Sequence, residues 1–181
     1  MSELKIFSAD EAQLLRSVVD HAEISSELSQ VGIKFGAWQA SQPLSEMAEQ
    51  DEVISTYRQS IDQLMAEYGF QSVDVIALRP DHSDHAALRQ KFLSEHSHSE
   101  FEVRFFVDGK GLFYIHQGEQ VYGVMCEQGD LISVPANTKH WFDMGEAPSF
   151  KCIRLFTNPE GWLAQYSGDQ IATNFPSFEQ F

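Results

Sequence analysis

The sequence predicts a mainly β protein, a sandwich or jelly roll with helices from the N-terminal half packed outside it. From Glu95 onward, short strands alternate with turn signals, a spacing typical of such folds and unlike a parallel α/β sheet. The 181 residues, 43% of them hydrophobic and fourteen of them Phe, can bury one sizeable core. We therefore expect one domain, with a mainly helical part over 1–92, a β-barrel over 93–166 and a tail over 167–181.

The N-terminal part is expected to combine helices with short strands. Residues 4–7 read as an edge strand, and Asp20 is a candidate N-cap for a helix that ends near Gln30. Over 51–68, apolar residues recur every three or four positions, which predicts one amphipathic helix packed on the sheet. Further strands are expected over 33–38 and 73–78, and a short helix over 86–92.

The C-terminal half reads as a series of short strands. We place them at 101–107, 112–116, 121–126, 131–135, 140–144 and 150–156, with a turn over 108–111. The chain after Trp162 is expected to be irregular or weakly helical and to wrap around the barrel.

Charge and composition exclude several classes of partner. The formal net charge of −15 argues against binding to nucleic acid or a membrane surface, which needs clustered Lys and Arg. No secretory signal pattern and no apolar run of the roughly 20 residues that a membrane span needs are found. We expect a cytoplasmic monomer in which Cys126 and Cys152 are reduced core thiols.

The spacing of two histidines and a glutamate suggests a metal site. In an extended strand the side-chain period is two, so His96 and His98 lie on one face and Glu102 stays in phase with them. Two imidazoles and a carboxylate suit a divalent ion such as Fe(II), Ni(II) or Mn(II). An isolated pair of this kind more often consists of hydrogen-bonded core or surface histidines. A second block that ends at His140 offers a fourth ligand and favours the metal site.

These two blocks resemble the two cupin motifs. The stretch from His96 to Gly109 matches G(x)5HxH(x)3–4E(x)6G, and the stretch from Gly129 to His140 matches G(x)5PxG(x)2H(x)3N. The resemblance implies the double-stranded β-helix of the cupins.

Three positions depart from the motifs. Asn137 replaces the glycine of the second motif, and it is the non-glycine residue that best tolerates a left-handed turn. Met144 and Gln90 stand where the motifs have Asn and Gly. These departures concern loop geometry and leave the four ligands in place.

Three longer runs of residues are similar to the acireductone dioxygenase family, and the similarity extends across nearly the whole chain. The matching runs are EVRFFV at 102–107, SVPANTKHWFDMG at 133–145 and NPEGW at 158–162. The resemblance implies that His96, His98, Glu102 and His140 hold one Fe(II) or Ni(II), with two neighbouring positions left for substrate.

The resemblance also implies a reaction in methionine salvage. Members of this family oxidise 1,2-dihydroxy-3-keto-5-methylthiopentene, an acireductone, with O2. The iron form yields formate and 4-methylthio-2-oxobutanoate. The nickel form yields formate, carbon monoxide and 3-methylthiopropanoate.

Arg104 and Arg154 are candidates for holding the anionic substrate. They are the only arginines after position 89, and both lie in apolar strand sequences where a charge needs a partner. One alternative is an ion pair with Glu95, Glu100 or Asp143. The other is that their guanidinium groups bind the enediolate beside the metal.

The remaining candidates carry weaker signals. Glu95 precedes the first ligand and is either a proton acceptor, an orienter of a ligand or a surface carboxylate. His116 lacks motif spacing and reads as a structural or rim histidine. The methylthio tail needs an apolar wall, for which the aromatic candidates, each of which is alternatively a core residue, are Phe92, Phe106, Phe142 and Trp162.

Two other functions compete with this one. A different cupin dioxygenase or isomerase would share the four ligands, although not the runs of residues that match this family. A non-catalytic cupin that binds a small molecule through its metal would show no turnover.

Overall fold

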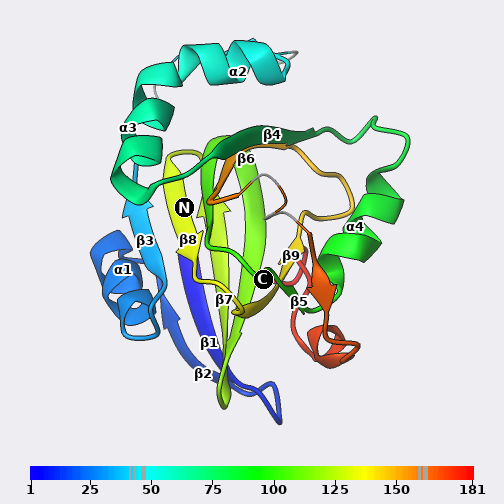
Figure 1. Ribbon diagram of the computed structural model, residues 1–181. Coiled ribbons are helices and arrows are strands. Elements are labelled where there is room, and N and C mark those ends of the chain that lie inside the picture. The colour runs from blue at the N-terminus through cyan, green and yellow to red at the C-terminus, as the bar shows by residue number, and fades with distance from the viewer. Residues whose placement is uncertain (41, 43, 46–47, 159, 161–162) are drawn as a thin grey trace.

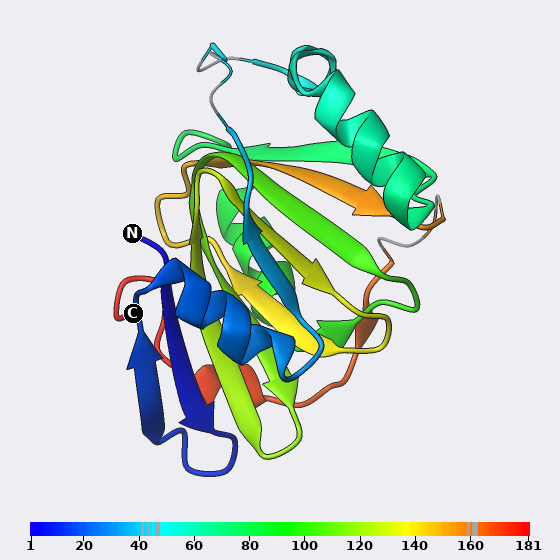
Figure 2. The same ribbon diagram turned by 90° about the vertical axis from the view of Figure 1, so that its left-hand side faces the viewer.

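The computed structural model consists of two antiparallel sheets packed face to face, with helices and the C-terminal segment outside them (Figures 1 and 2). It describes residues 1–40, 42, 44–45, 48–158, 160 and 163–181. The arrangement confirms the predicted mainly β jelly roll with helices on its outer surface. The part expected to be mainly helical nevertheless contributes four strands.

The large sheet has the order β11-β5-β9-β6-β7-β1-β2. Its strands other than β6 are β1 (Glu3–Ser8), β2 (Leu14–Val18), β5 (His96–Ser97), β7 (Gln120–Glu127), β9 (Lys139–Asp143) and β11 (Gln165–Tyr166). The small sheet has the order β4-β10-β6-β8-β3. Its strands other than β6 are β3 (Lys34–Ala37), β4 (Ser72–Leu78), β8 (Asp130–Val134) and β10 (Phe150–Phe156).

Strand β6 (Glu102–Gln117) belongs to both sheets. Its first half pairs with β8 and β10, and its second half pairs with β7 and β9. The turn predicted over 108–111 is therefore wrong, because the chain bends at Gly109 without leaving the sheet. Gly109 has φ 69°, and a Cβ there would lie 1.9 Å from the carbonyl oxygen of Ser149. Only glycine fits this bend.

The helices confirm most of the N-terminal predictions. Helix α1 (His21–Ser29) is capped by Asp20, whose side chain accepts a hydrogen bond from the Glu23 amide. Helix α4 (His85–Leu93) leads into β5. No helix in the described ranges is long and apolar enough to cross a membrane.

Two predictions in this part are wrong. The helix expected over 51–68 is two helices, α2 (Gln50–Thr56) and α3 (Arg58–Tyr68), because Tyr57 between them leaves helical geometry while its ring packs on Phe105. Strand β1 is not at an edge, since β2 pairs along it. Sequence patterning missed β2 because four of its five residues are exposed and do not alternate.

Three apolar layers result. The interior between the sheets contains Phe106, Phe113 and Phe142, together with the two free, buried thiols of Cys126 and Cys152, as predicted. A second layer joins α2 and α3 to the outer face of the small sheet, and a third joins the C-terminal segment to the outer face of the large sheet. The C-terminal segment is irregular apart from β11 and a short 3-10 helix at Ile171–Asn174, as expected.

Candidate metal centre

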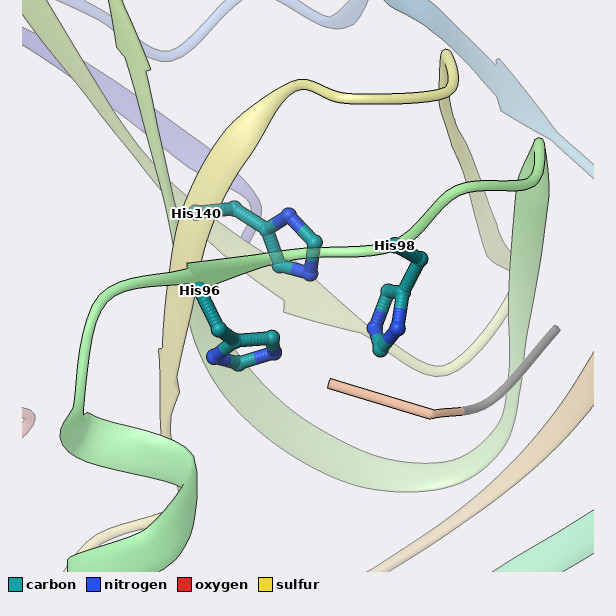
Figure 3. Close-up of side chains that lie close together, drawn as sticks. All are labelled: His96, His98 and His140. Atoms are coloured by element: carbon teal, nitrogen blue, oxygen red, sulfur yellow. The ribbon is translucent and has the colours of Figure 1, made fainter. Parts of the chain in front are cut away.

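Strands β5 and β9, together with the residue that follows β5, bring three histidines together. His96 and His140 are direct cross-strand partners, and His98 follows two residues after His96 on the same face. One nitrogen from each of His96, His98 and His140, here called the histidine cluster, lies within 4.8 Å of the others. All three side chains are buried, and Figure 3 shows their rings turned towards a common space.

Backbone carbonyls fix the orientation of each ring. The Nδ1 atoms of His96, His98 and His140 lie 2.7, 3.0 and 2.8 Å from the carbonyl oxygens of Ser94, Leu163 and Thr138, respectively. A carbonyl can only accept, so each Nδ1 carries the proton and each Nε2 keeps its lone pair. Within the described part of the chain, Nε2 of His140 is buried and has no hydrogen-bond partner.

Glu102 joins the cluster from β6, as its strand phase predicts. Its Oε2 atom lies 3.5 Å from Nε2 of His98 and 3.9 Å from Nε2 of His140. This oxygen is buried and has no hydrogen-bond partner among the described residues. Orphaned buried polar atoms are rare in folded proteins. Two of them, Oε2 of Glu102 and Nε2 of His140, face the histidine cluster together, and this arrangement fits a divalent cation.

The electrostatics favour the ligand forms of these groups. Burial lowers the pKa of His96 and lowers that of His140 to about 3, so both rings are neutral at pH 7. Burial alone would raise the pKa of Glu102, but the nearby positive charge of Arg104, above all, outweighs it and lowers the value to about 2. The centre therefore offers neutral imidazoles and an ionised carboxylate, which are the species that bind metal.

Asn137 adopts the left-handed backbone conformation that the glycine of the motif would adopt. It has φ 62°, in the left-handed region, and its amide donates to the carbonyl of His98 at 2.7 Å. The loop before His140 is thereby tied to the segment that carries His98 just after β5, and the predicted left-handed turn is confirmed.

Each arginine has an ion-pair partner that the sequence did not predict. Nε of Arg104 donates to Oε1 of Glu102 at 2.6 Å, and its guanidinium lies over the rings of Phe113 and Phe142. Nε and Nη2 of Arg154 donate to Asp74 at 2.8 and 2.6 Å. The partners named in the ion-pair alternative, Glu95, Glu100 and Asp143, are therefore wrong. Asp74 faces Arg154 across the β4–β10 pair, and Glu102 precedes Arg104 by two residues on the same strand. Asp143 instead pairs with Arg89.

Comparison with known proteins agrees with this geometry. A family model described as the ARD/ARD' family matches residues 4–164. The acireductone dioxygenase of Aquifex aeolicus (strain VF5) is 53% identical over 180 residues, which cover 99% of this chain and 98% of that protein. The chain belongs to the acireductone dioxygenase family.

Other members of the family support the assignment. The acireductone dioxygenase of Pseudomonas savastanoi pv. phaseolicola is also 53% identical over 180 residues, 99% of each chain. A solved structure of acireductone dioxygenase from Bacillus anthracis superposes with a TM-score of 0.80 at 28% identity, covering 92% of this chain and 98% of that one. That structure holds a cadmium ion in its active centre.

Three of the four aromatic candidates in this family member pack together in the interior layer. Phe106 and Phe142 are buried in the interior layer with ring centroids 6.3 Å apart, and Phe92 from α4 meets Phe142 edge to face. Trp162 lies outside the described residues. Sequence reasoning missed Phe113, which stacks on the His140 ring at 5.3 Å and 18°. Only the β6–β9 register reveals that contact.

Glu95 does not contact the histidine cluster. It is 1% exposed, so the surface-carboxylate alternative is wrong. Its Oε2 atom accepts a hydrogen bond from Nδ1 of His116 at 2.7 Å, and its Oε1 atom lies 3.5 Å from Nζ of Lys139. His116 is thus a structural histidine, as expected.

Proposed function

We propose that this protein oxidises 1,2-dihydroxy-3-keto-5-methylthiopentene with O2, as an acireductone dioxygenase of methionine salvage acting as a cytoplasmic monomer. The observation that carries the proposal is the convergence of Nε2 of His140 and Oε2 of Glu102, both buried and without a protein partner, on the other two histidines. Membership of the family supplies the substrate.

We assign one Fe(II) or Ni(II) to Nε2 of His96, His98 and His140 and Oε2 of Glu102. Such a ligand set suits both ions, and nickel binds more tightly than iron to a given site, so cellular supply decides between them. When bound, the ion would supply Lewis acidity toward the adjacent oxygens of the enediolate. We assign formate and 4-methylthio-2-oxobutanoate to the iron form, and formate, carbon monoxide and 3-methylthiopropanoate to the nickel form.

Arg104 is assigned two tasks. Its Nε holds Oε1 of Glu102, which leaves Oε2 for the metal, and the guanidinium also lies against the neighbouring rings of Phe113 and Phe142. The terminal nitrogens of the same group would pair with the anionic oxygens of the substrate. A buried cation here also favours the ionised enediol over the neutral one.

Arg154 is assigned no direct contact with the substrate. Its bidentate pair with Asp74 uses the donors that a substrate would need, which favours the ion-pair alternative. Its charge still lies close enough to lower the pKa of Glu102. We assign it to the electrostatic environment of the centre.

The methylthio tail is assigned to the aromatic side of the centre. Phe142 contacts both the Arg104 guanidinium and Phe92, so it links the anion-binding end to an apolar wall. Phe106 backs Phe142, and Trp162 stays a candidate from the sequence.

Oxygen uptake with the acireductone tests the proposal. Protein reconstituted with iron and, separately, with nickel is mixed with substrate in an oxygen electrode, and products are identified by chromatography and gas analysis. Uptake by both forms, with carbon monoxide from the nickel form alone, is expected. Tight metal binding without any uptake would contradict the proposal and favour a non-catalytic binding cupin.

A further inference from the structure

Strand β5 supplies His96 and leads directly into His98, yet it has little backbone support of its own. It consists of His96 and Ser97, and it pairs with β9 through the single residue pair His96 and His140. Its other neighbour, β11, is also only two residues long. A two-residue strand held this way does not fix side-chain directions to the precision that a metal site needs.

An ion-pair cluster built around one buried carboxylate lies on the opposite face of the same strand. Glu95 immediately precedes His96, so its side chain points away from the histidine cluster. Its carboxylate contacts His116 on β6 and Lys139 on β9, which are themselves direct cross-strand partners. We call Glu95, His116 and Lys139 the outer-face cluster.

The outer-face cluster is in register with the metal centre. The pair His116 and Lys139 is adjacent to the pair Ile115 and His140, and His140 in turn faces His96. The Glu95 carbonyl oxygen also accepts hydrogen bonds from the amide and hydroxyl of Ser167, at 3.0 and 3.3 Å, just after β11. One residue therefore ties β5 to β6, β9 and the C-terminal segment.

We propose that Glu95 is a positioning residue that, through His116 and Lys139, locks strand β5 onto β6 and β9 and so presents His96 and His98 to the metal. This inference rests on the proposed metal centre and deepens it. A carboxylate on the outer face cannot touch a substrate bound among the histidines, so Glu95 takes no proton from the enediol. Its effect on the reaction runs entirely through metal affinity and ligand geometry.

Metal affinity of a Glu95 variant tests the proposal. Apo-protein carrying Glu95→Ala is titrated with Co(II) in competition with a chelator, and the visible absorption of the bound Co(II) reports the ligand geometry. Loss of a group that orients metal ligands typically weakens affinity about 10- to 100-fold. We expect a loss in this range together with a changed spectrum, and Glu95→Gln, which still accepts from His116, should restore part of the affinity.

Asp130 provides the matched control. It is also a buried carboxylate paired with a histidine, His21 at 3.1 Å, but it begins β8 and contacts no member of the histidine cluster. Asp130→Asn should lower stability and leave Co(II) affinity within about twofold and the spectrum unchanged. Equal effects of the Glu95 and Asp130 variants on affinity, or none from either, would overturn the proposal.

A second variant covers failure of Glu95→Ala to fold. His116→Gln removes the other half of the 2.7 Å contact and should weaken Co(II) binding in the same direction. Unchanged affinity and spectrum in His116→Gln would also overturn the proposal. Because these readouts need no turnover, they are independent of the oxygen-uptake test of the wild-type protein.

Discussion

Replacing Arg104 by Met should destabilise the metal-free protein far more than the metal-loaded one. Arg104 is 4% exposed and donates to Glu102, which is 1% exposed. Removing one partner of a buried ion pair costs about 3–5 kcal/mol, because the other charge stays buried without compensation. For a chain of this length a loss of about 3 kcal/mol lowers Tm by roughly 6–12 °C. Met keeps apolar contact with Phe113 and Phe142, so the loss reflects mainly the charge.

A bound divalent ion should compensate the same carboxylate. The cost of Arg104→Met in the nickel-loaded protein is then expected to be less than half of the cost in the apo-protein. By linkage, every 1.4 kcal/mol of difference means about tenfold tighter metal binding by the variant, which should nevertheless lose turnover. Urea unfolding of both proteins, with and without nickel, measures the four free energies.

The double variant Glu102→Gln/Arg104→Met is the control, since it removes both charges and should recover most of the apo-protein loss. Equal costs with and without metal, or no cost in the apo-protein, would refute the idea that Arg104 and the ion share one carboxylate.

Three further predictions concern the centre and the core. His140→Ala should lose bound metal in elemental analysis, and full retention would remove His140 from the ligand set. Acid should destabilise the apo-protein. In the fold the pKa of His140 is about 3 and that of Glu102 about 2, against ordinary values of 6.5 and 4.5. As the pH falls, the unfolded chain therefore binds more protons than the folded chain. Stability should therefore drop from pH 6.5 downward, by up to about 1.4 kcal/mol per pH unit for each group, and urea unfolding that shows greater stability at pH 5 than at pH 7 would contradict this. Burial raises the pKa of Cys126 and raises that of Cys152 to about 12, so neither thiol should react with a disulfide reagent until denaturant is added, and fast labelling of the native protein would count against their burial.

The positions of the four candidate ligands could be predicted from the sequence because strand phase and motif spacing are local properties. His98 follows His96 by two positions, and a strand of any sheet puts them on one face. The same locality explains the success at Asn137, whose left-handed φ follows from the loop type.

Contacts set by register could not be predicted. Asp74 faces Arg154 because β4 pairs with β10, and Phe113 meets His140 because β6 pairs with β9. The local periodicity of a strand does not predict which other strand pairs with it. Glu95 combines both cases: alternation along the strand alone turns it away from His96, whereas its contacts with His116 and Lys139 depend on the β6–β9 register.

The turn predicted over 108–111 is wrong for a related reason. A Gly-rich stretch between apolar runs usually marks a turn. Here Gly109 lets one strand pass from the small sheet to the large one, which depends on how closely Ser149 approaches it.

A crystal structure of the nickel-loaded protein, with the ion located by its anomalous scattering, tests the central claim most directly. The account predicts one nickel ion per chain, roughly 2 Å from Nε2 of His96, His98 and His140 and from Oε2 of Glu102. An ion bound elsewhere, or a centre in which Glu102 turns away or a histidine binds through Nδ1, would contradict it.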